Sequence, residues 1–298
     1  MQVEGCPAGR TAAPRRRLAV VIRRHPLATF VALAFGVTWV VWIPRALGAP
    51  VGAVGQLSTW AVAVAAVLAA LLTGGRGAVR ELLSRLVRWR VGLRWYAVVL
   101  LGPAAFWVLT ALLFAALGGT WDDGPLGITT TDWALLPVVL LIAALTDGLG
   151  EELGWRGFAL PQLLARRTPL TASLVLGVVW AAWHLPLLWT PGAALHEQPP
   201  WLLVLDLLAK AVLFTWVFLH TRGSVLLAVL FHASLNVFSI PLAASSAGRP
   251  ALQVLALALE WVIAAAVVLA TRATFLHRVH DPECLPRDDG RRHATVHH

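Results

Sequence analysis

Charged residues are scarce in this chain of 298 residues: 13% are Asp, Glu, Lys or Arg, about half of the share in a soluble domain. Cysteine occurs only twice, as Cys6 and Cys284 in polar terminal stretches, which excludes a disulfide framework and a paired-thiol metal motif. Hydrophobic residues make up 58% of the chain. The composition predicts an all-α integral membrane protein with one polytopic domain.

Acidic residues are also few, since 15 Asp and Glu face 24 Lys and Arg, which gives a net charge of +9. Lys210 is the only lysine in the sequence. A basic balance of this size often indicates nucleic acid. Here, however, the arginines cluster at the ends of apolar runs, where they act as topology signals and meet anionic headgroups. We therefore predict the lipid bilayer as a partner and no nucleic acid.

The apolar runs predict about eight transmembrane helices between two polar tails, residues 1–26 and 271–298, the first of which we expect to be disordered. Arginine-rich ends alternate along the chain, which predicts both termini in the cytoplasm and, given the Arg- and Ala-rich composition, a bacterial plasma membrane. The predicted transmembrane domain covers 27–270, with spans near 27–43, 57–73, 95–117, 133–166, 170–189, 201–219, 225–242 and 252–270.

Two stretches of this layout are irregular. The basic connector 76–94 carries leucines at helical spacing, which predicts an amphipathic helix lying on the inner leaflet. The fourth apolar stretch, from Trp133 to Arg166, is longer than one span needs. We expect a break or tilt in it near Gly148, Gly150 or Pro161.

The fourth stretch contains the most unusual residues of the chain, Glu151, Glu152 and Arg156. Ionised groups inside a bilayer are costly, so they persist when they are paired or functional. On a helix Glu152 and Arg156 share a face, while Glu151 is turned about 100° from Glu152. The arginine can therefore hold Glu152 and leave Glu151 for chemistry. An ion pair that only fixes helix packing is the alternative.

Other polar residues interrupt the later spans. His184 ends the fifth, and His232 and Asn236 lie four apart on one face of the seventh. With Glu151 they come to similar depths, about 15 to 25 Å from the arginines that mark the inner end. Asp206, Lys210 and Glu260 form a separate set. Asp206 and Lys210 have the spacing of a self-neutralising pair, and Glu260 is either protonated or paired with Lys210; whether these three are functional stays open.

Glu151 and a histidine converging on one water can deprotonate it. A second histidine with Asn236 can donate hydrogen bonds to an oxyanion, often the largest contribution to catalysis in a dry site. Together these groups suit amide hydrolysis without a covalent intermediate. The same Glu and His atoms, from Glu151, His184 and His232, can instead hold a zinc ion with an open water position, although the helical His-Glu-x-x-His motif is absent.

Three motifs in this order resemble the CPBP family of intramembrane proteases, which contains the CAAX prenyl endopeptidases and the bacterial abortive-infection or bacteriocin-immunity proteins. They are Glu-Glu-x-x-x-Arg (151–156), aromatic-x-x-x-His (180–184) and His-x-x-x-Asn (232–236), and the resemblance covers roughly 133–240. Trp180 departs from the family, which usually has Phe there, and we expect this change to affect packing more than catalysis.

The resemblance implies an eight-helix membrane fold around a polar cavity open to the cytoplasm. It also implies that Glu151 and His184 activate water, that His232 and Asn236 stabilise the oxyanion, and that Glu152 and Arg156 support them. A zinc-dependent and a metal-free mechanism are both compatible with it, and the substrate is a peptide or protein at the membrane. The alternatives are an idle binding or immunity protein that uses the same cavity, and a proton-coupled carrier, although no repeated half is visible.

Overall fold

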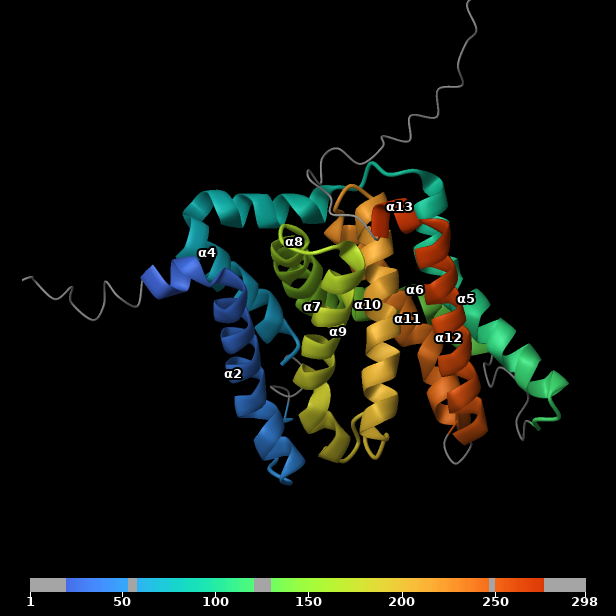
Figure 1. Ribbon diagram of the computed structural model, residues 1–298. Helices are drawn as coiled ribbons and strands as arrows, with labels where there is room; N and C mark the ends of the chain where they lie inside the picture. Colours follow the sequence, from blue (N-terminus) through green and yellow to red (C-terminus); the bar gives the residue numbers. More distant parts are fainter. Residues whose placement is uncertain (1–19, 53–57, 121–129, 247–249, 276–298) are drawn as a thin grey trace, which may run out of the picture.

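The computed structural model describes residues 20–52, 58–120, 130–246 and 250–275, and every regular element in these ranges is helical (Figure 1). Long apolar runs favour helices in lipid because a helix satisfies its backbone hydrogen bonds internally. The longer elements are α2 (Pro26–Ala46), α4 (Trp60–Ser84), α5 (Leu93–Ala116), α6 (Thr130–Ala143), α9 (Pro169–His184), α10 (Pro200–His220), α11 (Val225–Ser246) and α12 (Pro250–Ala270).

The chain is an all-helical polytopic membrane protein. Seven helical stretches in the described ranges are long and apolar enough to cross a bilayer, and a shorter apolar helix, Val225–Ser239, lies where the seventh predicted span was placed. Predicted and observed spans agree to within a few residues at most ends. The described part of the predicted N-terminal tail, 20–24, is helical, which differs from the disorder that we expected there.

Helix α10 lies at the centre of the bundle. In the apolar 18-residue stretch that marks α10 as a candidate span, 61% is buried. The corresponding share is 44% for the α9 span and 22–33% for the other candidate spans. Helix α10 packs against α9 on one side and α12 on another. Helix α11 packs against α5 and the segment that carries Glu151 and Glu152, which we call the acidic pair. The best-shielded interior therefore lies among α9, α10 and α11.

The fourth apolar stretch is one continuous helical run with two widened turns. Helix α6 passes into a π-helical segment, Ala144–Gly148, then α7 (Leu149–Gly154), a second π-helical segment, Trp155–Ala159, and α8 (Leu160–Leu164). The irregularity expected near Gly148 is therefore present, as a π-helical turn rather than a break. Single π-helical turns inside α-helices often mark functional sites.

Helix α7 approaches α4 closely because it presents glycine to it. A Cβ atom on Gly154 would lie 2.4 Å from Cγ1 of Val62 and 2.9 Å from its carbonyl oxygen. Small residues allow such backbone contact between membrane helices. The contact fixes the depth and rotation of the acidic pair, which lies on the same short helix.

The connector 76–94, predicted as an amphipathic helix, is helical over 76–87, and residues 88–92 are not helical. Gly75 has a positive φ of 69°, and at this kink α4 turns into a segment that runs across the ends of other helices (Figure 1). We call residues 76–87 the roof helix; its last turn, Arg85–Val87, is a 3-10 helix. Its Leu82 is 3% exposed and faces Gly157, next to the acidic pair. Its place on the inner leaflet stays a prediction.

Candidate functional site

Glu152 and Arg156 form the predicted ion pair in the interior. Nη1 of Arg156 donates to Oε1 of Glu152 over 2.8 Å, and both residues are 0% exposed. The guanidinium carbon lies 4.3 Å from the ring centre of Trp180 and 3.9 Å from that of Phe214. Cation–π contacts of this kind stabilise a desolvated arginine. The arginine is thereby held by Glu152 and two aromatic rings and leaves Glu151 free of it.

Glu151 is buried, at 3% exposed, and is held by indole N–H groups. Trp180 donates to its Oε2 over 2.7 Å and Trp155 over 3.3 Å. Its other oxygen, Oε1, lies 4.0 Å from Nε2 of His232. That distance exceeds a direct hydrogen bond and is one that a water can bridge. Glu151 thus has one fixed oxygen and one that faces an imidazole.

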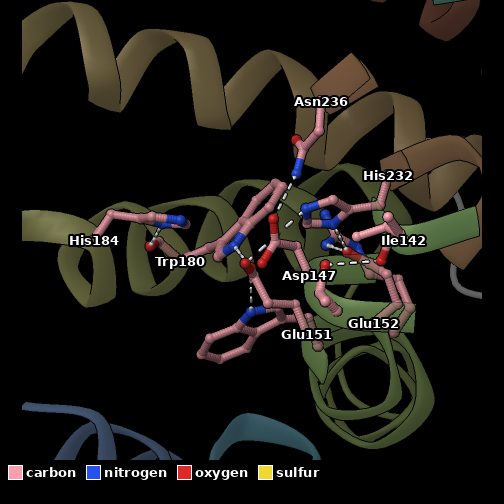
Figure 2. Close-up of polar contacts among 11 residues, drawn as sticks. Ile142, Asp147, Glu151, Glu152, Trp180, His184, His232 and Asn236 are labelled. Atoms are coloured by element: carbon pink, nitrogen blue, oxygen red, sulfur yellow. Dashed lines mark hydrogen bonds and ion pairs between the residues drawn. The ribbon is translucent and has the colours of Figure 1, made fainter. Parts of the chain in front are cut away.

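His232 connects the two glutamates. Its Nδ1 lies 2.7 Å from Oε1 of Glu152, and its Nε2 is the atom that faces Glu151. Because a carboxylate accepts, Nδ1 carries the proton of this hydrogen bond, which fixes the ring's orientation. Figure 2 shows His232 pointing from α11 toward the acidic pair. The structure therefore brings together two of the sequence-predicted groups, a carboxylate and an imidazole, from separate helices.

Asn236 lies one helical turn beyond His232, and its Nδ2 donates to Oδ2 of Asp147 over 3.3 Å (Figure 2). Asp147 is on the first π-helical segment, four residues before Glu151. Asp147 is a site residue that we did not predict from the sequence. The signal was present, since Asp147 is an acid in an apolar stretch at helical spacing from Glu151.

His184 is placed at the end of α9, which begins where Thr168 caps its first turn and Pro169 starts the helix. Its Nδ1 lies 2.9 Å from the carbonyl oxygen of Trp180, so Nδ1 carries the proton and Nε2 has a lone pair. Among the described residues no hydrogen bond or ion pair joins His184 to Glu151. Both residues are neighbours of the Trp180 indole, whose ring centre lies 5.9 Å from that of His184 (Figure 2).

Trp180 makes a polar contact as well as packing contacts, because its indole N–H donates to Glu151. A phenylalanine at this position would keep the ring, but it has no N–H to offer Glu151. The indole also lies 6.0 Å from the ring centre of His232. The two histidines and the glutamate thus surround one aromatic side chain whose polar edge faces the carboxylate.

Asp206, Lys210 and Glu260 lie apart from this site, between α10 and α12. Lys210 pairs with Asp206 and lies 3.2 Å from Oε1 of Glu260. The second alternative stated for Glu260, pairing with Lys210, is the one that the structure shows. No hydrogen bond or ion pair among the described residues connects this cluster to Glu151 or Glu152.

The zinc alternative requires three ligands around one point. Within the described ranges no group of three or more His, Cys, Asp or Glu side chains has a geometry that could hold a metal ion. In this arrangement Nδ1 of His184 is hydrogen-bonded to the carbonyl oxygen of Trp180. Nδ1 of His232 is hydrogen-bonded to Glu152. Zinc binding by Glu151, His184 and His232 stays a prediction. The polar cavity also stays a prediction.

These features define a class: a polytopic membrane protein with a buried carboxylate–imidazole–amide cluster contributed by α7, α9 and α11. The model of the family described as Type II CAAX prenyl endopeptidase Rce1-like matches residues 132–238, the part that carries every residue of the cluster. The protein named CAAX prenyl protease 2 from Methanococcus maripaludis is 28% identical over 210 residues, 67% of this chain and 74% of that protein. Over residues 132–238 the chain is therefore similar to this CAAX prenyl endopeptidase family.

Proposed function

We propose that this protein is an intramembrane endopeptidase that hydrolyses a peptide bond of a membrane-associated substrate without a covalent intermediate. The observation that carries the proposal is the environment of Glu151: a buried carboxylate with one oxygen fixed by two indole donors and the other 4.0 Å from an imidazole nitrogen. A carboxylate held in this way is suited to accept a proton from water. The similarity of residues 132–238 to the CAAX prenyl endopeptidase family and the name of the methanococcal relative support the same reaction class.

In the proposed mechanism Glu151 takes a proton from the water that attacks the scissile carbonyl, and His184 assists with the lone pair on its Nε2. His232, protonated on Nε2 as well as on Nδ1, and Asn236 donate hydrogen bonds to the oxyanion that forms. Asp147 orients the Asn236 amide, because a carboxylate accepts from Nδ2 and so directs the NH₂ end inward. Glu152 and Arg156 keep His232 in place. Glu151 then returns the proton to the leaving amine.

The test is the variant Glu151→Gln, which keeps the side chain's size and removes its ability to accept a proton as a base. We expect peptide cleavage to fall at least a thousandfold, within the range for a general base. Cleavage would be measured on reconstituted protein, with substrates found by comparing membrane proteomes of wild-type and variant cells. A variant that folds and cleaves like the wild type would refute the proposal. A matched control is Glu260→Gln, outside the site, which should retain activity.

The assignment of His184 has its own test. His184→Ala should lower cleavage about a hundredfold if its Nε2 assists the water, as for other acid–base groups. The control is His196→Ala, because His196 lies in the loop that follows His184 and leads to α10. If His184→Ala lowers cleavage less than fivefold, the imidazole that serves the water is that of His232 alone.

Metal dependence is tested by removal. We propose a metal-free reaction, so purified protein treated with a chelator and assayed for both bound metal and cleavage should keep its activity. Activity that disappears on chelation and returns with Zn²⁺ would assign the reaction to the zinc alternative. An idle binding or immunity protein would show substrate binding with no Glu151-dependent product.

A further inference from the structure

The roof helix carries basic residues that the proposed reaction does not use. Arg85, and Arg88 directly after the helix, are occupied, because Glu81 lies 3.5 Å and 2.7 Å from their Nη2 atoms. Arg76 and Arg80, by contrast, are exposed and make no hydrogen bond or ion pair with any residue that the structure describes. The roof helix therefore offers two unpaired guanidinium groups.

These arginines share a face with exposed apolar residues. Positions 76, 80, 83 and 87 recur at intervals of four, three and four, so their side chains lie along one side of the helix. Leu83 is 43% exposed and Val87 is 71% exposed. The opposite side is packed, since Leu82 is buried against the helix that carries the acidic pair. A helix with arginines beside exposed apolar groups is typical of a membrane interface.

An apolar recess lies beneath this face. It has a volume of about 380 Å³ and is bounded by α4, the roof helix and α7. Its walls include Val64, Leu68, Leu83, Leu86, Leu149 and Leu153, and every lining residue is apolar. Leu83 belongs both to the recess and to the exposed face, so the recess meets the face of the roof helix that carries the two arginines.

We propose that the roof helix and the recess bind an anionic glycerophospholipid. Arg76 and Arg80 bind its phosphate and headgroup, because the planar guanidinium matches phosphate oxygens and keeps its charge. One acyl chain occupies the recess, where it covers apolar walls. The arginines and the apolar recess together fit a ligand that has a negatively charged head and an apolar tail. The inference is independent of the proposed peptidase activity.

The experiment uses the purified full chain in detergent, titrated with dioleoylphosphatidylglycerol or dioleoylphosphatidylcholine, with bound lipid counted by native mass spectrometry. The two lipids share acyl chains and differ in net charge. We expect phosphatidylglycerol to bind at least tenfold more tightly. The double variant Arg76→Gln/Arg80→Gln should lose about twentyfold in affinity for it and bind both lipids alike.

A matched control removes the same charge elsewhere. Arg166 and Arg167 are exposed and follow α8, at the same end of the bundle as the roof helix (Figure 1). Arg166→Gln/Arg167→Gln should keep the preference for phosphatidylglycerol. Equal binding of the two lipids by the wild type, or an equal loss in both double variants, would overturn the headgroup site.

The recess is tested separately with Leu83→Trp, which places bulk in it and leaves both arginines. Binding of both lipids should weaken at least fivefold, while their affinity ratio stays the same. Unchanged binding would show that no chain enters the recess. Glycerol phosphate, which has the anionic head without a tail, should bind far more weakly than the lipid; binding as tight as phosphatidylglycerol would also refute the acyl-chain site.

Discussion

Two clusters of charged residues lie within the predicted spans of this protein, and they differ in how their charges are satisfied. In the first, Arg156 holds Glu152, while Glu151 is bound by neutral indole donors. In the second, Lys210 stands between Asp206 and Glu260. The side chains of the first ion pair are at most 1% exposed, whereas those of Lys210 and Asp206 are 20% and 30% exposed.

This difference teaches that a charge inside a membrane is not by itself a sign of chemistry. Lys210 contacts both carboxylates of its cluster, between α10 and α12, and this arrangement favours a role in helix packing. Glu151 has no arginine or lysine partner among the described residues, and its Oε1 lies 4.0 Å from Nε2 of His232. The carboxylate left without a cation, rather than the number of charges, marks the candidate site.

The largest effect on the free energy of unfolding is expected for Arg156→Leu, in the first cluster. It leaves Glu152 fully buried without its cation, which costs about 3–5 kcal/mol for a buried pair. The free energy of unfolding, measured in mixed micelles with increasing sodium dodecyl sulfate, should fall by that amount. Adding Glu152→Gln should restore most of it, because both charges are then gone. A single variant as stable as the wild type would contradict the pair's structural role.

The next effect concerns the oxyanion. Asn236→Leu removes a proposed donor while keeping a side chain of similar size, and loss of one such donor typically lowers the rate about 10²–10³-fold. The turnover number on reconstituted protein should fall within that range, and KM should change little. Gln253→Leu, an amide on α12, is the control and should retain activity. If both variants cleave equally well, Asn236 is not an oxyanion donor.

A smaller effect is expected for Trp180→Phe. Glu151 keeps the aromatic neighbour but loses the shorter of its two hydrogen bonds, and hydrogen bonds to charged groups contribute about 1.5–3 kcal/mol. We expect the turnover number to fall about tenfold or more. Trp183→Phe is a matched control on the same helix, because its buried N–H has no partner among the described residues. Equal effects in both variants would show that ring packing, not the hydrogen bond, is responsible.

The smallest effect on catalysis is expected in the second cluster. Lys210→Met should lower the free energy of unfolding by about 1–2 kcal/mol, between the values for exposed and buried pairs. The activity of each folded molecule should stay at the wild-type level, which is measured by normalising cleavage to folded protein. A large loss of specific activity would break the comparison and give this cluster a part in the reaction.

Much of the fold could be predicted because hydrophobic length and arginine placement are properties of the sequence. The Glu152–Arg156 pair followed from helical spacing, and the approach of Glu151 to His232 from their similar depth. The hydrogen bonds from Trp155 and Trp180 could not be predicted, because they depend on indole orientation rather than on spacing. Asp147 lies in a π-helical segment, whose rotation per residue a regular 3.6-residue period does not describe, so its contact with Asn236 could not be predicted either.

The two π-helical turns have a consequence for chain length. A π-helical turn uses about one residue more than the α-helical turn that it replaces. A relative lacking one residue in 144–148 or in 155–159 can therefore keep a regular helix there and still direct Glu151 toward His232. Removal of a residue within α7 cannot be compensated in this way, because it rotates the Glu151 carboxylate by about 100° about the helix axis. Insertions and deletions among relatives should then collect on either side of the acidic pair and spare the six residues between.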